Sequence, residues 1–224
     1  MQLVDWQIEE EMIAGNIVIE PFDRRQLEGT SYDVRLGEWY YKERKPASGK
    51  IELLNPWSEK SLLRMYGNEV HQAQEARALL TAAQIKDLEL KPTDRIIIIN
   101  PGESILGHTE EFIGGKASIE PAMHARSSIG RWQIEVCKCA GWGDPGYINR
   151  WTMEITVNPL YHALTFIVGR RIAQIEFTAV EKPVKGNYAL NGKYQTDSDL
   201  ASVMANWMPA QMLPRLYKDW DLKE

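Results

Sequence analysis

The chain is short of several residue types and patterns that mark common protein classes. It has 224 residues but only two cysteines and four histidines. Its longest apolar run covers residues 96–99, far below the roughly 20 residues that a membrane-spanning helix needs. The N-terminal residues show no pattern of a secretory signal peptide. We therefore expect a cytoplasmic protein with no membrane partner.

The two cysteines, Cys137 and Cys139, suit neither a disulfide nor a zinc site. On a strand, residues i and i+2 point to the same face, which makes a bridge between them awkward. No pair of histidines lies nearby in the sequence to complete a zinc site. We therefore predict two reduced thiols, as is usual in the cytosol, and no metal held by protein ligands.

The signatures of several enzyme classes are also missing. Zinc-dependent nucleobase deaminases carry H-x-E followed by P-C-x-x-C, and neither motif occurs here. Residues 114–116, Gly-Gly-Lys, lack the rest of a phosphate-binding P-loop. The four histidines fall in no recognisable Ser-His-Asp setting.

The bulk composition is that of a globular protein. Apolar residues make up 44% of the chain and charged residues 25%, with a formal net charge of −5. An acidic balance disfavours nucleic acid and membrane surfaces as partners. The length fits one large or two small domains, and we find no internal repeat.

From residue 92 to about 182 the pattern favours short strands separated by Gly, Pro and Asn. A spacing of roughly 8–12 residues between such strands is typical of a β-sandwich or barrel, so we predict an all-β fold. We also expect a strand at residues 17–20. Residues 185–199 are rich in glycine and polar side chains, and we expect this segment to be mobile.

Three stretches have helical character instead. Residues 5–14 are predicted to form a short helix, with Asp5 as its cap and Gly15 at its end. Residues 57–90 have helical spacing and few β-formers. Residues 199–213 are predicted to form a final amphipathic helix. Its apolar positions are Leu200, Val203, Met204 and Trp207.

The stretch 139–155, CAGWGDPGYINRWTMEI, contains G-x-G-x-x-G, the pattern of a dinucleotide-binding loop. That motif requires a strand before it and a helix after it. Residues 134–139 alternate as a strand, but residues 151–157 also alternate apolar and polar side chains, which predicts a second strand. We therefore interpret the stretch as strand, tight turn and strand, with Asp144 at the tip and Glu154 on the returning strand.

Two further groups of residues could carry chemistry. In residues 124–131, HARSSIGR, a helix that starts at the serines would offer free N–H groups to an anion, and Arg126 and Arg131 would add phosphate donors. The alternative is a capped helix with two surface arginines. Glu154 shares a strand face with Thr152 and Thr156. It is either a solvated face residue or, if buried beside arginines, a general base.

Taken together, these stretches resemble the dCTP deaminase/dUTPase family. The resemblance rests on motifs in one order, with matched spacing through residues 126–154, and it spans about residues 17–195 apart from 57–90. The motifs are IEPFDRRQLEGTSYDVRLG (19–37), NPGESILGHTEEF (100–112), ARSSIGR (125–131), AGWGDPGY (140–147), TMEI (152–155), GRRIAQIEF (169–177) and GKYQ (192–195).

The resemblance implies a distorted β-barrel, similar to a jelly roll, that assembles as a homotrimer with active sites between subunits. It implies a nucleotide-processing domain over residues 1–198, with 57–90 as a helical insertion and 199–224 as a helical tail. The expected substrate is a pyrimidine deoxynucleoside triphosphate, and Mg²⁺ is expected to arrive on the triphosphate, with no dedicated protein ligands.

The resemblance also implies a role for individual residues. Glu154 matches the general base that activates a water against cytosine C4, and Ser127 and Arg131 match residues that position this water and stabilise the developing charge. Asp144 matches a sugar-contacting carboxylate, which in dUTPases activates the water that attacks the α-phosphate. The other expected substrate contacts are Arg126, Ser128, Ala140, Trp142, Thr152, Met153, Gln174, Tyr188 and Lys193.

The expected reaction is zinc-independent deamination of dCTP to dUTP. Trp142 and the GKYQ stretch resemble the bifunctional branch, which continues to dUMP and pyrophosphate. Two alternatives stay open at this point: a dUTP diphosphatase only, and a non-catalytic nucleotide-binding regulatory trimer on the same scaffold.

Overall fold

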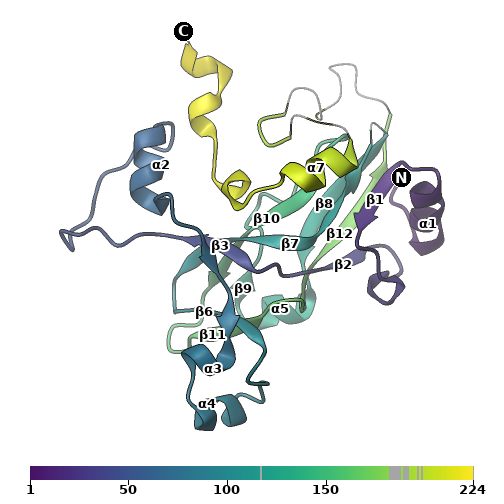
Figure 1. The fold of residues 1–224 in the computed structure, drawn as a ribbon. Helices are drawn as coiled ribbons and strands as arrows, with labels where there is room; N and C mark the ends of the chain where they lie inside the picture. Colours follow the sequence, from purple (N-terminus) through teal and green to yellow (C-terminus); the bar gives the residue numbers. More distant parts are fainter. Residues whose placement is uncertain (117, 182–187, 189–191, 196, 198, 224) are drawn as a thin grey trace.

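The computed structural model describes residues 1–116, 118–181, 188, 192–195, 197 and 199–223. The segment 185–199, for which the sequence predicts mobility, lies largely outside these residues. Within the described part, antiparallel sheets form the body of the molecule, and the helices are short and lie around it (Figure 1). The mostly-β class predicted from the sequence is therefore confirmed.

The largest sheet has six strands and is built around two long ones, β7 (Ser104–Gly115) and β10 (Ile148–Val157). The strand order is β4-β3-β7-β10-β9, and β1 also pairs with β7. Glu154 on β10 pairs with Leu106 on β7, and Thr152 pairs with His108. The remaining strands of this sheet are β1 (Ile17–Glu20), β3 (Trp39–Lys42), β4 (His71–Gln72) and β9 (Ile134–Glu135).

Two three-stranded sheets complete the β structure. One has the order β2-β12-β8 and the other β11-β6-β5. The pairing of the described strands leaves three separate sheets and does not close a barrel. The strands are β2 (Tyr32–Arg35), β8 (Ile119–Ala125), β12 (Arg171–Ala179), β5 (Gln74–Glu75), β6 (Arg95–Ile99) and β11 (Leu164–Ile167).

The core forms where the sheets face one another, and isoleucine dominates it. Met153, Ile155 and Val157 of β10 are fully buried, as are Ile97 and Ile99 of β6. β-Branched side chains suit this role because they pack well on a pleated surface.

The N-terminal helix α1 (Asp5–Ile13) and strand β1 confirm two sequence predictions. The predicted cap of the helix is wrong, because Val4 is the N-cap and Asp5 is already helical. The side chain of Gln7 accepts a hydrogen bond from the Val4 N–H at 3.1 Å, which satisfies one of the free N–H groups at a helix start. A 3₁₀ turn, η1 (Arg24–Gln26), precedes β2.

Residues 57–90 contain three short helices and the strands β4 and β5. Ser58 caps the first helix and Thr81 caps the third, each by accepting a backbone N–H bond from the residue three positions on. The helices are α2 (Glu59–Tyr66), α3 (Ala76–Leu79) and α4 (Ala82–Asp87). No helix in the described part of the chain is long and apolar enough to cross a membrane.

The C-terminal helix is shorter than predicted. Helix α7 (Leu200–Asn206) ends before Trp207, which has extended backbone angles, and Pro209 follows two residues later. Proline disfavours helical geometry in the residue before it, so the pattern continues as three 3₁₀ turns. These are η2 (Pro209–Met212), η3 (Leu216–Lys218) and η4 (Trp220–Lys223).

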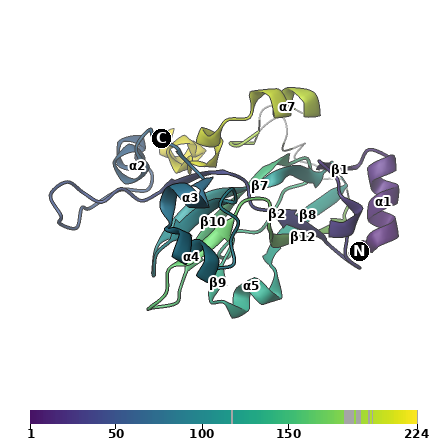
Figure 2. The ribbon, with the colours of Figure 1, turned by 60° about the horizontal axis from the view of Figure 1, so that its bottom comes forward.

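Residues 199–223, the C-terminal tail, run along one face of the six-stranded sheet (Figures 1 and 2). The ring of Trp207 packs against His108 of β7, with ring centroids 4.7 Å apart. Met212 joins a small apolar cluster with Tyr41 of β3 and Leu106 of β7. The tail therefore covers the face of the sheet on which the side chain of Glu154 also lies, because Glu154 of β10 pairs with Leu106 of β7.

Candidate active site

The alternation along β10 sets the chemistry of its two faces. Met153 and Ile155 are completely buried in the core, and Thr152 and Glu154 point the other way and are partly exposed. This confirms the predicted division of the strand. Leu106 lies directly opposite Glu154 on β7, so the two side chains share a face of the sheet.

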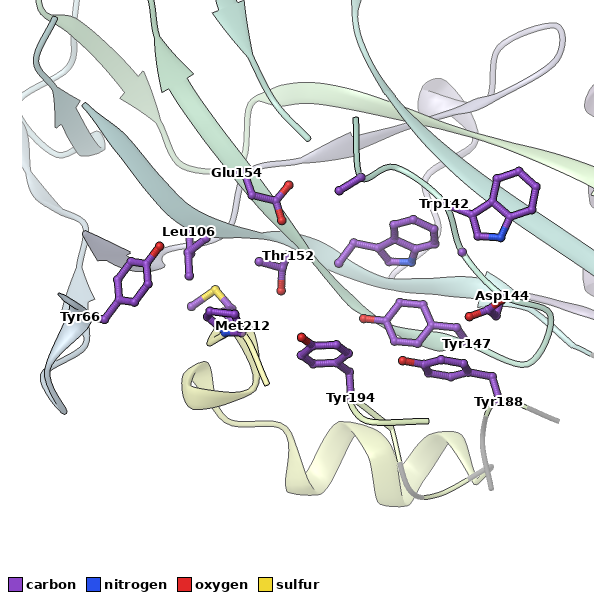
Figure 3. Close-up of a pocket in the computed structure, with 14 residues that line it drawn as sticks. Tyr66, Leu106, Trp142, Asp144, Tyr147, Thr152, Glu154, Tyr188, Tyr194 and Met212 are labelled. Carbon is purple, nitrogen blue, oxygen red and sulfur yellow. The ribbon is translucent and has the colours of Figure 1, made fainter. Parts of the chain in front are cut away.

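A pocket of about 500 Å³ opens above this face (Figure 3). Glu154 and Thr152 form its floor, the loop before β10 forms one side, and the C-terminal tail forms another. Its size is in the usual range for small-molecule sites. The lining residues are Tyr66, Leu106, Ala140, Trp142, Gly143, Asp144, Tyr147, Trp151, Thr152, Glu154, Tyr188, Tyr194, Met212 and Pro214.

The environment of Glu154 is unusual for a carboxylate. Burial raises the pKa of Glu154 from 4.5 to about 7, against the lowering effects of a backbone hydrogen bond and of the Lys138 charge. Its Oε2 atom is buried and has no hydrogen-bond partner in the part of the chain that the structure describes. A carboxylate that is poised near neutral pH and has an open acceptor can take a proton and return it.

This pKa shift has a consequence for stability. A carboxyl group with a raised pKa binds its proton more tightly in the folded than in the unfolded state, so stability falls as pH rises from 4.5 to about 7. Glu154→Gln removes this loss. The variant should gain about 3 kcal/mol in free energy of unfolding at pH 8 and almost nothing at pH 4.5, measured by urea denaturation.

Glu135→Gln is the matched control for this measurement. Glu135 is exposed on β9, the strand beside β10 in the same sheet, and is absent from the pocket lining. The Glu135→Gln variant should have the same free energy of unfolding as the wild type at both pH values. An equal gain for Glu154→Gln at pH 4.5 and pH 8 would contradict a raised pKa at Glu154.

The connection between β9 and β10 corrects several details of the sequence interpretation. Strand β9 covers only Ile134 and Glu135, and the chain then turns, with Lys138 in the left-handed region at a φ of 47°. Cys137 is therefore buried and Cys139 exposed, both as free thiols, and they do not share a strand face. The connection is long rather than a tight turn, although β9 and β10 do pair antiparallel.

The glycines in this connection bring the chain close to itself. A side chain at Gly141 would meet the carbonyl oxygen of Met123 at 2.1 Å, and one at Gly143 would meet the Trp151 ring at 2.3 Å. The N–H groups of Gly143 and Gly146 donate to Pro121 and Gly115. The strand β10, and not a helix, follows, so the dinucleotide-binding interpretation stays rejected. These two N–H groups are therefore already used within the chain.

The predicted anion-binding residues lie elsewhere. Helix α5 (Ser127–Arg131) is on the opposite side of the molecule from the C-terminal tail in both ribbon views (Figures 1 and 2). Arg126 is its N-cap, so neither serine caps the helix as the sequence suggested. Ser127, Ser128 and Arg131 are exposed and absent from the Glu154 pocket.

Arg126 is held in place by a buried acid. Its Nε lies 3.0 Å from Oδ2 of Asp33, and Arg171 approaches the same oxygen at 2.9 Å. The Asp33 side chain is only 2% exposed, and breaking such a buried pair is strongly destabilising. The arginine is therefore fixed at the end of β8.

The other predicted contacts are distributed between these regions. Ala140, Trp142, Asp144, Thr152, Tyr188 and Glu154 all line the pocket. Met153 lies beneath it in the core, and Gln174 sits on β12 opposite Asp33 and His124. Lys193 contacts Asp219 of the tail and is not part of the pocket lining.

Sequence patterns missed much of the pocket wall. Tyr66 comes from α2, and Met212 and Pro214 come from the tail. These residues lie outside every motif that we identified. Leu106 was within reach of prediction, because it lies in a motif strand and pairs directly with Glu154. Among the residues that the structure describes, no cluster of three or more His, Cys, Asp or Glu side chains could hold a metal ion.

Fold and pocket together define a β-sheet protein with a half-buried carboxyl group in a pocket. Comparison with known proteins is more specific. A profile of the dCTP deaminase-like family matches residues 2–180. A dCTP deaminase, dUMP-forming, of Nanoarchaeum equitans is 30% identical over 203 residues, which cover 90% of this chain and 96% of that protein. A dCTP deaminase of Halorubrum lacusprofundi is 28% identical over 199 residues, which cover 87% of this chain and 86% of that protein.

A solved structure supports the same fold. The 2′-deoxycytidine 5′-triphosphate deaminase from Agrobacterium tumefaciens is similar with a TM-score of 0.53 and 18% identity. The match covers 80% of this chain and 47% of that one, so this chain corresponds to about half of its length. The chain belongs to the dCTP deaminase-like family, as the sequence motifs predict.

Proposed function

We propose that this protein deaminates dCTP without zinc and continues to dUMP and pyrophosphate. The observation that carries the proposal is Glu154 on the floor of the pocket, where burial raises its pKa to about 7 and its Oε2 has no hydrogen-bond partner among the residues that the structure describes. The names of the relatives support the substrate, because they are called dCTP deaminase or dCTP deaminase, dUMP-forming.

In the first step, Glu154 takes a proton from a water molecule whose oxygen forms a bond to C4 of cytosine. As that bond forms, the electron pair of the C4–N3 double bond moves to N3, which takes up the second proton of the water. The bond from C4 to the exocyclic nitrogen then breaks, Glu154 gives its proton to the leaving amino group, and ammonia and uracil result. Ser127 and Arg131 position the water and stabilise the developing charge. A positioned base contributes about 10²–10⁴-fold, and a pre-organised donor about 10²–10³-fold.

In the second step, Asp144 activates a water against the α-phosphate. The new oxygen–phosphorus bond replaces the bond to the β-phosphate, and pyrophosphate leaves. Arg126, Ser128, Gln174 and Lys193 contact the nucleotide. Mg²⁺ would neutralise part of the charge on the triphosphate and would arrive with the substrate.

The position of the pocket and of the arginines supports sites that are shared between subunits. Within one chain, α5 lies on the opposite side of the molecule from the C-terminal tail (Figure 1), and Arg131 does not line the pocket that Glu154 shares with that tail. A homotrimer of barrel-like subunits would bring the α5 residues of one subunit to the Glu154 pocket of the next. We assign residues 1–198 to this nucleotide-processing domain, 57–90 to an insertion and 199–224 to a tail.

Complementation tests the shared site. Glu154→Gln and Arg131→Ala are each expected to be inactive, and their mixture, unfolded and refolded together, should recover activity. In a trimer that pairs Glu154 of one subunit with Arg131 of the next, about a quarter of the sites would have both native residues. No recovery in a mixture that elutes as a trimer would overturn the shared site.

The test of the function itself is incubation with dCTP and with dUTP, with ammonia and pyrophosphate measured separately. Release of both products from dCTP supports the dUMP-forming reaction. Ammonia alone indicates a deaminase, and pyrophosphate from dUTP alone indicates a diphosphatase. Binding without either product indicates a regulatory nucleotide-binding protein. The cytoplasmic location is part of the proposal, supported by the free thiols of Cys137 and Cys139.

A further inference from the structure

The pocket extends past Glu154 into a recess that none of the predicted site residues enters. Asp144, Trp142, Tyr147 and Tyr188 gather at one end of the pocket in Figure 3, and Glu154 and Thr152 lie in the middle. The other end, on the far side of Glu154, is the apolar recess. Tyr66, Leu106 and Met212 form its walls (Figure 3), and Pro214, two residues after Met212 in the tail, also lines the pocket.

Strand register and the tail build this recess beside the reacting carboxylate. Leu106 is the cross-strand neighbour of both Glu154 on β10 and Tyr41 on β3. Met212 is 4% exposed and packs in the cluster with Leu106 and Tyr41, against which Tyr66 also packs. The pKa of Tyr66 is raised, mainly by burial and in smaller part by the charges of Glu43 and Glu154.

The tail that carries Met212 is fixed at several points. Trp207 lies against His108 and over the Arg150 guanidinium at 4.7 Å. The Arg215 N–H donates to the Tyr194 hydroxyl at 3.0 Å, and its guanidinium lies over the same ring. Because the contacts of Trp207 and Arg215 hold both ends of residues 207–215, the position of Met212 in the wall of the recess is fixed.

The chemistry of the recess determines what it can accept. Its walls present aliphatic, thioether and proline carbons, and the Tyr66 hydroxyl is the one polar group among the four side chains. An apolar surface gains from burying an alkyl group and gives nothing to a charged phosphate or a hydroxylated sugar. The proposed function directs the sugar toward Asp144 and C4 toward Glu154, so the recess faces the C4 side of the pyrimidine.

We propose that the apolar recess is a specificity pocket for a small alkyl substituent on the cytosine ring beside or on the reacting C4 centre. This inference rests on the proposed function and narrows its substrate class to alkylated deoxycytidine triphosphates. The methyl group could stand at either of two positions on the base: on C5 or on the exocyclic nitrogen.

The test compares kcat/KM for dCTP, 5-methyl-dCTP and N4-methyl-dCTP, with ammonia or methylamine as the measured product. One of the methylated substrates should exceed dCTP by about 4-fold, the worth of one buried methyl group. Met212→Phe, which fills the recess, should lower that preference at least about 10-fold through KM.

Leu213→Ala is the matched control. Leu213 packs against the same apolar cluster as Met212 but does not line the pocket, so its truncation should reduce stability and leave the preference unchanged. If Met212→Phe fails to fold, Met212→Ala should fold and shift the preference toward 5-ethyl-dCTP, because it enlarges the recess.

If dCTP is converted but kcat/KM for both methylated substrates is at least about 10-fold lower, the proposal of a specificity pocket is wrong. The proposed function would be unaffected by that result. If no nucleotide is converted, the proposed function is wrong. Dissociation constants from calorimetry with the wild-type protein would then test the specificity pocket independently. Tighter binding of one methylated nucleotide than of dCTP supports the recess, and equal or weaker binding of both overturns it.

Discussion

Glu154→Gln is expected to lower ammonia release from dCTP by at least about 10²-fold and to leave nucleotide affinity within a few-fold. The substitution keeps the shape of the side chain and its place opposite Leu106, but an amide cannot take the proton from water. A loss in kcat without a matching loss in affinity is what removal of a positioned base produces.

The measurement is ammonia release at saturating dCTP, together with the dissociation constant of dCTP from calorimetry. Glu135→Gln is the control, since it changes an exposed acid on the neighbouring strand. Near wild-type ammonia release by Glu154→Gln would show that another group is the base. A large loss of affinity with little change in kcat would make Glu154 a binding residue.

The same carboxyl group should set the pH dependence of the wild-type enzyme. Only the ionised form of Glu154 can accept a proton, and burial raises its pKa to about 7. Below pH 7 the kcat/KM for deamination should therefore fall about tenfold per pH unit, and above it the rate should reach a plateau. A rate that stays constant from pH 5 to pH 8 would contradict this assignment.

Local sequence patterns were sufficient to predict the strand at residues 17–20, the strand-rich region after residue 92 and the face on which Glu154 lies, but not β4 and β5 within residues 57–90. The alternation at residues 151–157 depends only on neighbouring residues, and β10 follows it. The extent of β9 and of the last helix was wrong for local reasons that the pattern does not contain. Lys138 adopts a left-handed backbone angle, and Pro209 ends the helical pattern.

The walls of the pocket could not be predicted in the same way. Tyr66 lines the pocket because it packs against Tyr41 of β3 and Leu106 of β7. Met212, in the same cluster, is more than 50 residues from Glu154 in the chain. Such contacts depend on tertiary packing and leave no periodic signal. That Arg131 does not line the Glu154 pocket of its own chain also lies beyond any local pattern, since it depends on how the sheets are arranged.

Asp144→Asn is expected to impair the second step most, with pyrophosphate release about 10²-fold slower and ammonia release within a few-fold of the wild type. Asp144 lies at the end of the pocket away from the apolar recess, beside Tyr147 and Tyr188 (Figure 3). Its carbonyl oxygen accepts a hydrogen bond from the Tyr147 N–H at 3.0 Å. This turn does not involve the side chain, so the loop should keep its shape when the carboxylate becomes an amide.

The variant should therefore convert dCTP and accumulate dUTP, which chromatography of the nucleotides would detect directly. Asp87→Asn changes an exposed acid on α4, outside the pocket, and should make dUMP at the wild-type rate. Equal losses of ammonia and pyrophosphate would assign Asp144 to substrate binding. Unchanged pyrophosphate release would place the activation of the second water on another group. The contrast with Glu154→Gln is decisive, because removal of the first base leaves dCTP unconverted, whereas removal of the second allows deamination and stops the reaction at dUTP.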